Sequence, residues 1–190
     1  MAGSELIVIS GGPGAGKTTV LLELARRGFQ CAAEVARQII QEQVREGGDA
    51  LPWGNCERYC RVMLERSIDS YREYASGTGV TFFDRGLPDT LCYARLIGLS
   101  FEDEIFVACQ RYRYATRAFL APPWQEIYAA DMERRQTFEE AVKTYSLMVE
   151  AYKDCGYEVV EIPRVAPTER ADFIVGMLLR MNSVNFLKQN

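Results

Sequence analysis

A glycine-rich segment, GGPGAGKTT at residues 11–19, constrains this chain more than any other feature of its sequence. Its start fits the spacing G-x-x-x-x-G-K-[ST], which lets backbone N–H groups converge on phosphate oxygens. The apolar run LIVIS precedes it and the helical pattern VLLELARRGF follows it. The segment therefore joins a strand to a helix N-terminus, where the helix dipole favours negative charge. This context predicts a phosphate-binding loop in an α/β fold.

The residues of this loop have distinct predicted roles. Lys17 would reach the β and γ phosphates of a nucleoside triphosphate, the Thr18 hydroxyl would coordinate Mg²⁺, and Thr19 would contact the α phosphate. The predicted nucleotide site comprises Gly12, Gly14, Ala15, Gly16, Lys17, Thr18 and Thr19. ATP is the expected ligand and GTP the alternative. Recognition of the base is weakly encoded, because the [NT]-K-x-D sequence of many GTPases is absent and residues 164–166 offer mainly backbone groups.

Composition excludes several classes of protein. The net charge of −4 and pI of about 5.1 leave no broad basic face for nucleic acid. The absence of histidine excludes Ser-His catalysis and the usual zinc sites, and the six cysteines contain no C-x-x-C pair. No signal peptide and no apolar stretch of membrane-spanning length is evident. We therefore expect a cytoplasmic protein with reduced cysteines, whose oligomeric state the sequence does not indicate.

Strand-like runs alternate with amphipathic helical runs, the pattern of a parallel sheet covered on both faces. We expect one domain over residues 1–182, with a lid at about 122–136 and a loose tail at 183–190. Ser100 and Asp103 resemble a capping box at the start of a helix. The expected strands are 6–10, 29–33, 80–83, 117–121 and 157–162, and the expected helices are 18–27, 34–46, 55–75, 88–98, 100 onward, 137–155 and 168–181.

Two further motifs follow predicted strands. Asp84, in FFDRG, stands at the tip of an apolar strand and could hold Mg²⁺ directly or through water. Arg85 could bind an acceptor or a phosphate, or form a structural salt bridge. Glu34 and Arg37, in EVAR, follow the second strand, where a carboxylate can accept the proton of the hydroxyl to be phosphorylated. Glu34 could equally serve only to complement the dipole of its helix.

The connection PPWQEIYAADMERRQ, after the fourth strand, has the composition of a closing lid. Arg134 or Arg135 would neutralise charge that develops on a transferred phosphoryl group. Trp124 and Tyr128 could line an acceptor pocket or pack at its rim.

Together, GGPGAGKTT, EVARQIIQE, FFDRGLPD, APPWQEIY, DMERRQTFEEA and GYEVVEIP resemble a family of small P-loop proteins known as AAA-type predicted ATPases. This family is grouped with the ribosylnicotinamide kinase domain of the bacterial NAD-regulator protein and with an insect trafficking protein that binds GTP and phosphoinositide. The resemblance implies a three-layer P-loop fold like that of nucleoside and nucleotide kinases, with five parallel strands in the order 2-3-1-4-5. It also implies that Glu34, Asp84, Arg85 and the arginines of the lid are site residues.

The sequence is compatible with two functions. The first is a Mg²⁺-dependent phosphotransferase that moves the γ-phosphoryl of ATP to a small-molecule acceptor. The second is a regulatory module that binds ATP or GTP, hydrolyses it slowly and thereby controls binding of a protein or lipid partner. No acceptor-binding signature identifies the substrate.

Overall fold

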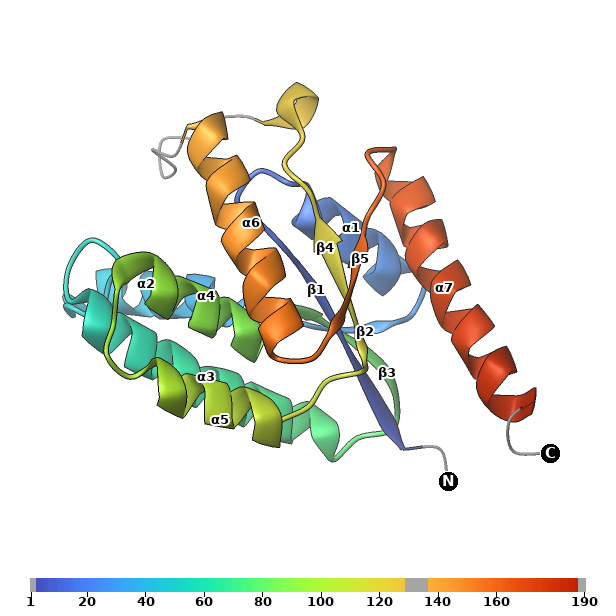
Figure 1. Ribbon diagram of the computed structural model, residues 1–190, viewed down its shortest axis with the longest axis horizontal. Coiled ribbons are helices and arrows are strands. Elements are labelled where there is room, and N and C mark those ends of the chain that lie inside the picture. Colours follow the sequence, from blue (N-terminus) through green and yellow to red (C-terminus); the bar gives the residue numbers. More distant parts are fainter. Residues whose placement is uncertain (1–2, 129–136, 188–190) are drawn as a thin grey trace.

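The computed structural model describes residues 3–128 and 137–187. Its centre is a five-stranded parallel sheet with the strand order β2-β3-β1-β4-β5, as the family resemblance implies. Helices cover both faces, so the predicted three-layer α/β fold is confirmed (Figure 1). The strands are β1 (Ser4–Gly11), β2 (Gln30–Ala32), β3 (Gly79–Asp84), β4 (Arg117–Ala121) and β5 (Glu158–Glu161).

The helices divide unequally between the two faces (Figure 1). Helices α1 and α7 pack on one face, and α2 to α6 lie on the other. Their bounds are α1 (Lys17–Arg26), α2 (Val35–Glu46), α3 (Cys56–Ala75), α4 (Leu87–Ile97), α5 (Glu102–Arg111), α6 (Phe138–Asp154) and α7 (Pro167–Leu187), with a short 3-10 helix η1 (Gln125–Ile127) after β4.

The central strand β1 is buried on both sides, which explains its unbroken apolar run. Ile7 and Ile9 belong to the core beneath α1 and α7. Leu6 and Val8 point the other way, into the larger core beneath α2 to α6. Successive side chains of a strand point to opposite faces of the sheet, so β1 packs against the helices on both faces.

The strand order determines which loops meet around the phosphate-binding loop. That loop follows β1, the central strand. The loops after β2 and β3, with Glu34 and Arg85, lie on one side of it, and those after β4 and β5, with Trp124 and Val165, lie on the other. Because the strands are parallel, all these loops emerge at the same edge of the sheet.

Two local expectations are wrong. Helix α7 continues to Leu187 instead of ending near Met181, since no glycine or proline follows Gly176 to stop it. The proposed Ser100 capping box does not form, because α5 begins after Phe101, whose ring is buried in the core. The acidic first turn of α5 complements the helix dipole instead.

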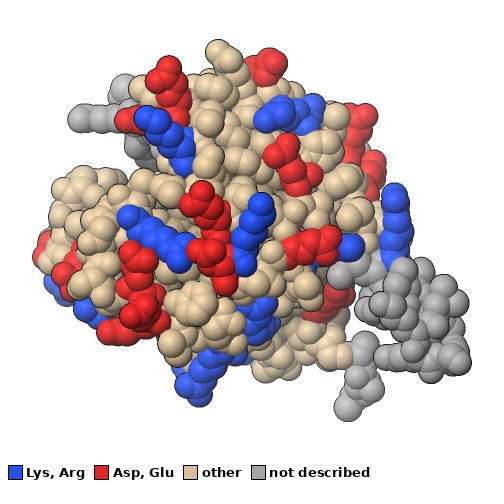
Figure 2. Space-filling model, viewed as in Figure 1, with Lys and Arg blue, Asp and Glu red and all other residues tan. Residues whose placement is uncertain are grey.

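Acidic and basic side chains are interspersed on the face drawn in Figure 2, where neither sign forms a continuous field. None of the helices in the described part of the chain is both long and apolar enough to span a membrane.

Candidate nucleotide and acceptor site

The phosphate-binding loop has the backbone conformation that its glycines permit. Gly14 and Gly16 have φ angles of 73° and 77°, in the left-handed region that residues with a Cβ rarely adopt. Gly16 caps the N-terminus of α1, which leaves the first N–H groups of that helix free of helical partners. The loop therefore offers backbone donors to an anion, as the sequence predicts.

Lys17 is held inside this loop. Its Nζ donates hydrogen bonds to the carbonyl oxygens of Gly11 (2.9 Å) and Gly12 (3.2 Å). Burial and the nearby charge of Arg85 lower the pKa of Lys17 to about 8. A phosphate group would supply the negative charge that this buried ammonium lacks.

A cavity of about 500 Å³ opens beside the loop and gathers most of the predicted site. It brings together predicted nucleotide residues and predicted acceptor residues from loops after all five strands. Gly12 does not line the cavity, but its carbonyl holds Lys17. The lining residues are Pro13, Gly14, Ala15, Gly16, Lys17, Thr18, Thr19, Glu34, Arg37, Arg85, Trp124, Ile127, Val165, Ala166, Pro167 and Arg170.

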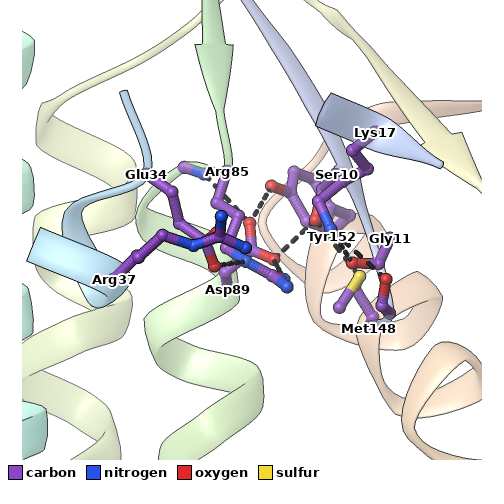
Figure 3. A network of polar contacts seen from close by, with 11 residues as sticks. Ser10, Gly11, Lys17, Glu34, Arg37, Arg85, Asp89, Met148 and Tyr152 are labelled. Carbon is purple, nitrogen blue, oxygen red and sulfur yellow. Dashed lines mark hydrogen bonds and ion pairs between the residues drawn. The ribbon is translucent and has the colours of Figure 1, made fainter. Parts of the chain in front are cut away.

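Glu34 is positioned at this cavity by two arginines (Figure 3). Arg85 Nε donates to Glu34 Oε1 at 2.7 Å, and Arg37 Nε lies 3.6 Å from Glu34 Oε2. Burial acts to raise the pKa of Glu34, but the charges of Arg85 and Lys17 overcome it and lower that pKa to about 2. Glu34 is therefore an ionised carboxylate across the loop from Lys17, suited to accepting a hydrogen bond from a hydroxyl group.

Arg85 is fixed at both its backbone and its side chain. It has a φ of 73°, the one positive φ among the described non-glycine residues, and its N–H donates to the carbonyl of Ile9 at 3.0 Å. Its Nη1 donates to Asp89 Oδ1 at 3.0 Å. A left-handed conformation at a residue with a Cβ costs about 1–2 kcal/mol, and such strain is typical of functional sites.

Asp89 anchors this array, and the sequence analysis did not identify it. Its carboxylate accepts hydrogen bonds from the Ser10 hydroxyl at 2.5 Å, the Tyr152 hydroxyl at 2.5 Å and the Gly86 N–H at 2.9 Å (Figure 3). The available signal was its position in the first turn of the helix that follows Arg85, where an acidic side chain can accept from the backbone N–H that precedes the helix. Ser10 and Tyr152 lie far from it in sequence and could not have been paired with it.

One oxygen of the Asp84 carboxylate, Oδ1, is buried and has no hydrogen-bond partner among the residues that the structure describes. Burial raises the pKa of Asp84, while the positive charge of Lys17 opposes that increase. Asp84 lines a neighbouring cavity of about 20 Å³, and Thr18 is exposed in the large cavity. A carboxylate oxygen without a hydrogen-bond partner, close to a phosphate-binding loop, can serve as a ligand for a Mg²⁺ ion that also binds the phosphates.

The predicted lid is only partly described. Arg134 and Arg135 lie outside the described residues, so their predicted role stays a prediction. Trp124 lines the cavity, whereas Tyr128 packs over the loop: a Cβ added at Gly14 would lie 3.0 Å from Tyr128 Cδ2. The ring of Tyr128 also contacts Phe138, with ring centroids 5.5 Å apart.

Arg170, in the first turns of α7, is a second residue that sequence reasoning missed. Its side chain is 1% exposed, and its Nη1 donates to the carbonyl of Ala15 at 3.0 Å. Its Nε donates to the carbonyl of Pro163 at 3.1 Å. Nothing in its local sequence signals this contact, because it depends on how α7 packs against α1.

A parallel sheet of this order, with a phosphate-binding loop between its central strand and the next helix, defines a P-loop α/β fold. Residues 6–170 match the family described as AAA domain. This match covers most of the chain, and the chain belongs to that family. No curated protein matches the sequence.

Solved structures with this fold include several kinases. The NadR protein in complex with NR superposes with a TM-score of 0.68 at 19% identity, over 88% of this chain and 49% of that one. This chain thus spans about half the length of that NadR protein. Thymidylate kinase from Candida albicans has a TM-score of 0.68 at 11% identity, covering 96% of this chain and 94% of its own. Deoxyadenosine kinase from M. mycoides, with products dCMP and dCDP bound, has a TM-score of 0.64 at 15% identity, covering 92% and 99%.

Proposed function

We propose that this protein is a Mg²⁺-dependent phosphotransferase that moves the γ-phosphoryl group of ATP to a hydroxyl group of a small-molecule acceptor. The observation that carries the proposal is the ionised Glu34 carboxylate, held by Arg85 at 2.7 Å in the same cavity as Lys17. A protein that only senses a nucleotide needs phosphate contacts alone. A carboxylate fixed across the cavity adds a group that can bind the attacking hydroxyl.

The proposed reaction gives distinct roles to the phosphate-binding loop, to Glu34, and to Thr18 and Asp84. Lys17 and the N–H groups of the loop bind the β and γ phosphates, and Glu34 orients the acceptor hydroxyl. Glu34 receives the hydroxyl proton as the new bond to the γ-phosphorus forms and the bond from that phosphorus to the β,γ-bridging oxygen breaks, which releases ADP. Because the pKa of Glu34 is about 2, orientation contributes more than basicity. Thr18 and Asp84 are the residues that would hold Mg²⁺, which supplies charge neutralisation on the phosphates when bound.

The acceptor is expected to carry a negative charge or several hydroxyl groups. Arg37 is exposed and lines the cavity beside Glu34, so it can meet a carboxylate or phosphate of the acceptor. The described NadR, thymidylate kinase and deoxyadenosine kinase structures support nucleosides and nucleotides as the first acceptors to test.

The test is transfer of labelled phosphate from ATP across a panel of nucleosides, nucleotides and small hydroxy acids. We expect acceptor-dependent transfer by the wild type, and loss of about 100-fold or more in turnover for Glu34→Gln with nearly unchanged ATP affinity. Arg66→Gln, which removes an exposed arginine on α3, is the matched control and should retain full activity. Slow hydrolysis of ATP that no acceptor accelerates, and that Glu34→Gln does not change, would contradict the proposal and favour a regulatory nucleotide-binding module.

A further inference from the structure

The ion pair between Arg85 and Glu34 uses only part of each side chain. Arg85 Nε donates to Glu34 Oε1 at 2.7 Å, whereas Arg85 Nη2 makes no hydrogen bond within the described part of the chain. Glu34 Oε2 also has no hydrogen-bond donor among the described residues, because Arg37 Nε, its ion-pair partner, lies 3.6 Å away. One oxygen and one nitrogen of this pair are therefore unused, although both side chains line the cavity of about 500 Å³.

A complete pair of the same two residue types occurs elsewhere in the molecule. On α1, Arg26 Nε donates to Glu23 Oε2 and Arg26 Nη2 donates to Glu23 Oε1, each at 2.9 Å. This fork of two parallel hydrogen bonds is a geometry that guanidinium and carboxylate groups frequently adopt. The Arg85–Glu34 pair has the same groups available, so another contact must keep its fork open.

A hydrogen bond to Asp89 holds the Arg85 guanidinium in this orientation. Arg85 Nη1 donates to Asp89 Oδ1 at 3.0 Å (Figure 3). The guanidinium is planar and rigid, so an anchor at Nη1 fixes the direction in which Nε and Nη2 point. The N–H of Arg85 is bonded to the carbonyl of Ile9, which fixes the main chain from which the side chain extends. To close the fork onto Glu34, the guanidinium would have to turn away from Asp89.

Asp89 is itself immobilised, which makes it an effective anchor. The Ser10 hydroxyl donates to Asp89 Oδ1 at 2.5 Å. The Tyr152 hydroxyl and the Gly86 N–H donate to Asp89 Oδ2 at 2.5 and 2.9 Å. These donors come from β1, from α6 and from the residue before α4. The position of the carboxylate therefore follows from the packing of the core and not from α4 alone.

We infer that Asp89 is a positioning residue: it keeps Arg85 from closing a fork onto Glu34, so that Glu34 Oε2 is left to accept the hydrogen bond of the acceptor hydroxyl. Glu34 Oε1 then fixes the carboxylate against Arg85, and Oε2 is the atom that meets the acceptor. Asp89 does not line the large cavity and acts through Arg85. The inference rests on the proposed phosphotransfer and specifies which oxygen of Glu34 serves it.

Crystal structures test the geometry without any acceptor. In Asp89→Asn the amide is neutral and holds Arg85 less strongly, so we expect Arg85 Nε and Nη2 both to donate to Glu34. A single hydrogen bond between Arg85 and Glu34 in this variant would overturn the inference. If Asp89→Asn does not fold, Asp89→Ser replaces it with the same expectation, because serine is shorter and uncharged but can still accept from the Gly86 N–H. A fork in crystals of the wild type with Mg·ATP bound would overturn the inference without any variant.

Steady-state kinetics test the consequence for the reaction. Asp89→Asn should lower kcat for acceptor-dependent transfer by about 10-fold or more, with a nearly unchanged KM for ATP, because a fork would occupy the oxygen that the hydroxyl needs. Ile105→Ala, which removes a fully buried apolar side chain from α5, is the matched control for lost stability and should retain kcat per folded molecule. An equal fall in kcat in both variants, or a higher KM for ATP with unchanged kcat, would show that Asp89 only stabilises the fold.

The two tests separate this inference from the proposed function. Transfer by the wild type, with an unchanged Arg85 in Asp89→Asn, would overturn the role of Asp89 and leave the proposed function intact. Absence of transfer by the wild type would overturn the proposed function, and the role of Asp89 in it, whatever the geometry of Arg85. A fork in Asp89→Asn together with the loss of kcat would support both.

Discussion

Lys17, which we propose binds the phosphates, has a charged form that is unfavourable in the unliganded protein. Its ammonium group is buried beside Arg85, and its two hydrogen-bond partners are neutral carbonyls. The charge is therefore unfavourable in the free protein, and bound phosphates would offset this cost. The charged form of Glu34 is instead favourable in the unliganded protein, because its arginine partners stabilise the ionised carboxylate.

This environment of Lys17 predicts a pH dependence of stability. The pKa of Lys17 is about 8 in the folded protein and 10.5 as its ordinary value, so between these pH values the unfolded chain binds more protons. Stability must then rise with pH in that window, by about 2 kcal/mol between pH 7.5 and 9.5. Urea unfolding of the wild type and Lys17→Met at both pH values measures this difference. Parallel pH profiles for the two proteins would contradict it.

At the scale of elements, Asp89 ties α4 to β1 and α6. Its carboxylate joins the first turn of α4, Ser10 of β1 and Tyr152 of α6, and it also holds Arg85. An anionic acceptor that serves four donors inside the core is difficult to replace, because all four donors would lose an acceptor at once.

We predict that Asp89→Asn lowers the free energy of unfolding by about 3 kcal/mol, because the amide presents donors to groups that are themselves donors. Tyr152→Phe removes one donor and leaves the carboxylate with three others, so it should cost only about 1 kcal/mol. Denaturant unfolding of both variants provides the comparison. If the two substitutions lower the free energy of unfolding by the same amount, Asp89 is not the residue that holds these hydrogen bonds together.

The elements themselves were largely predictable from sequence. Glycines close several helices, and Gly47 and Gly98 adopt the left-handed conformation at the C-caps of α2 and α4. Apolar runs located the strands, and the loop motif gave the position of Lys17 and Thr18. The contacts of Asp89 with Ser10 and of Arg170 with Ala15 span 79 and 155 residues, so they depend on packing that no local pattern reports.

At the scale of the molecule, the cavity is assembled from loops that follow all five strands. A ligand bound there contacts segments from both halves of the sheet, and it therefore opposes global unfolding instead of stabilising only one loop. Lys17 lines this cavity, and we propose that its charge stabilises such a ligand whether or not phosphoryl transfer follows.

We therefore predict that Mg·ATP stabilises the whole fold, by an amount that increases with the logarithm of its concentration above the dissociation constant. At about 100 times its dissociation constant it should add about 2.7 kcal/mol, which corresponds to roughly 5–10 °C in Tm for a domain of this size. Differential scanning calorimetry measures this shift. Lys17→Ala should abolish the shift, whereas Glu34→Gln should retain it, because Glu34 acts on the acceptor and not on the phosphates.

Arg117→Gln is the control for nonspecific effects, because it removes a partly exposed ion pair with Glu158 at the sheet, and Mg·ATP should raise its Tm as much as that of the wild type. A shift of equal size in Lys17→Ala would place the nucleotide outside the loop. Loss of the shift in Glu34→Gln would instead make Glu34 a nucleotide-binding residue, and the carboxylate–arginine pair would no longer support an acceptor site.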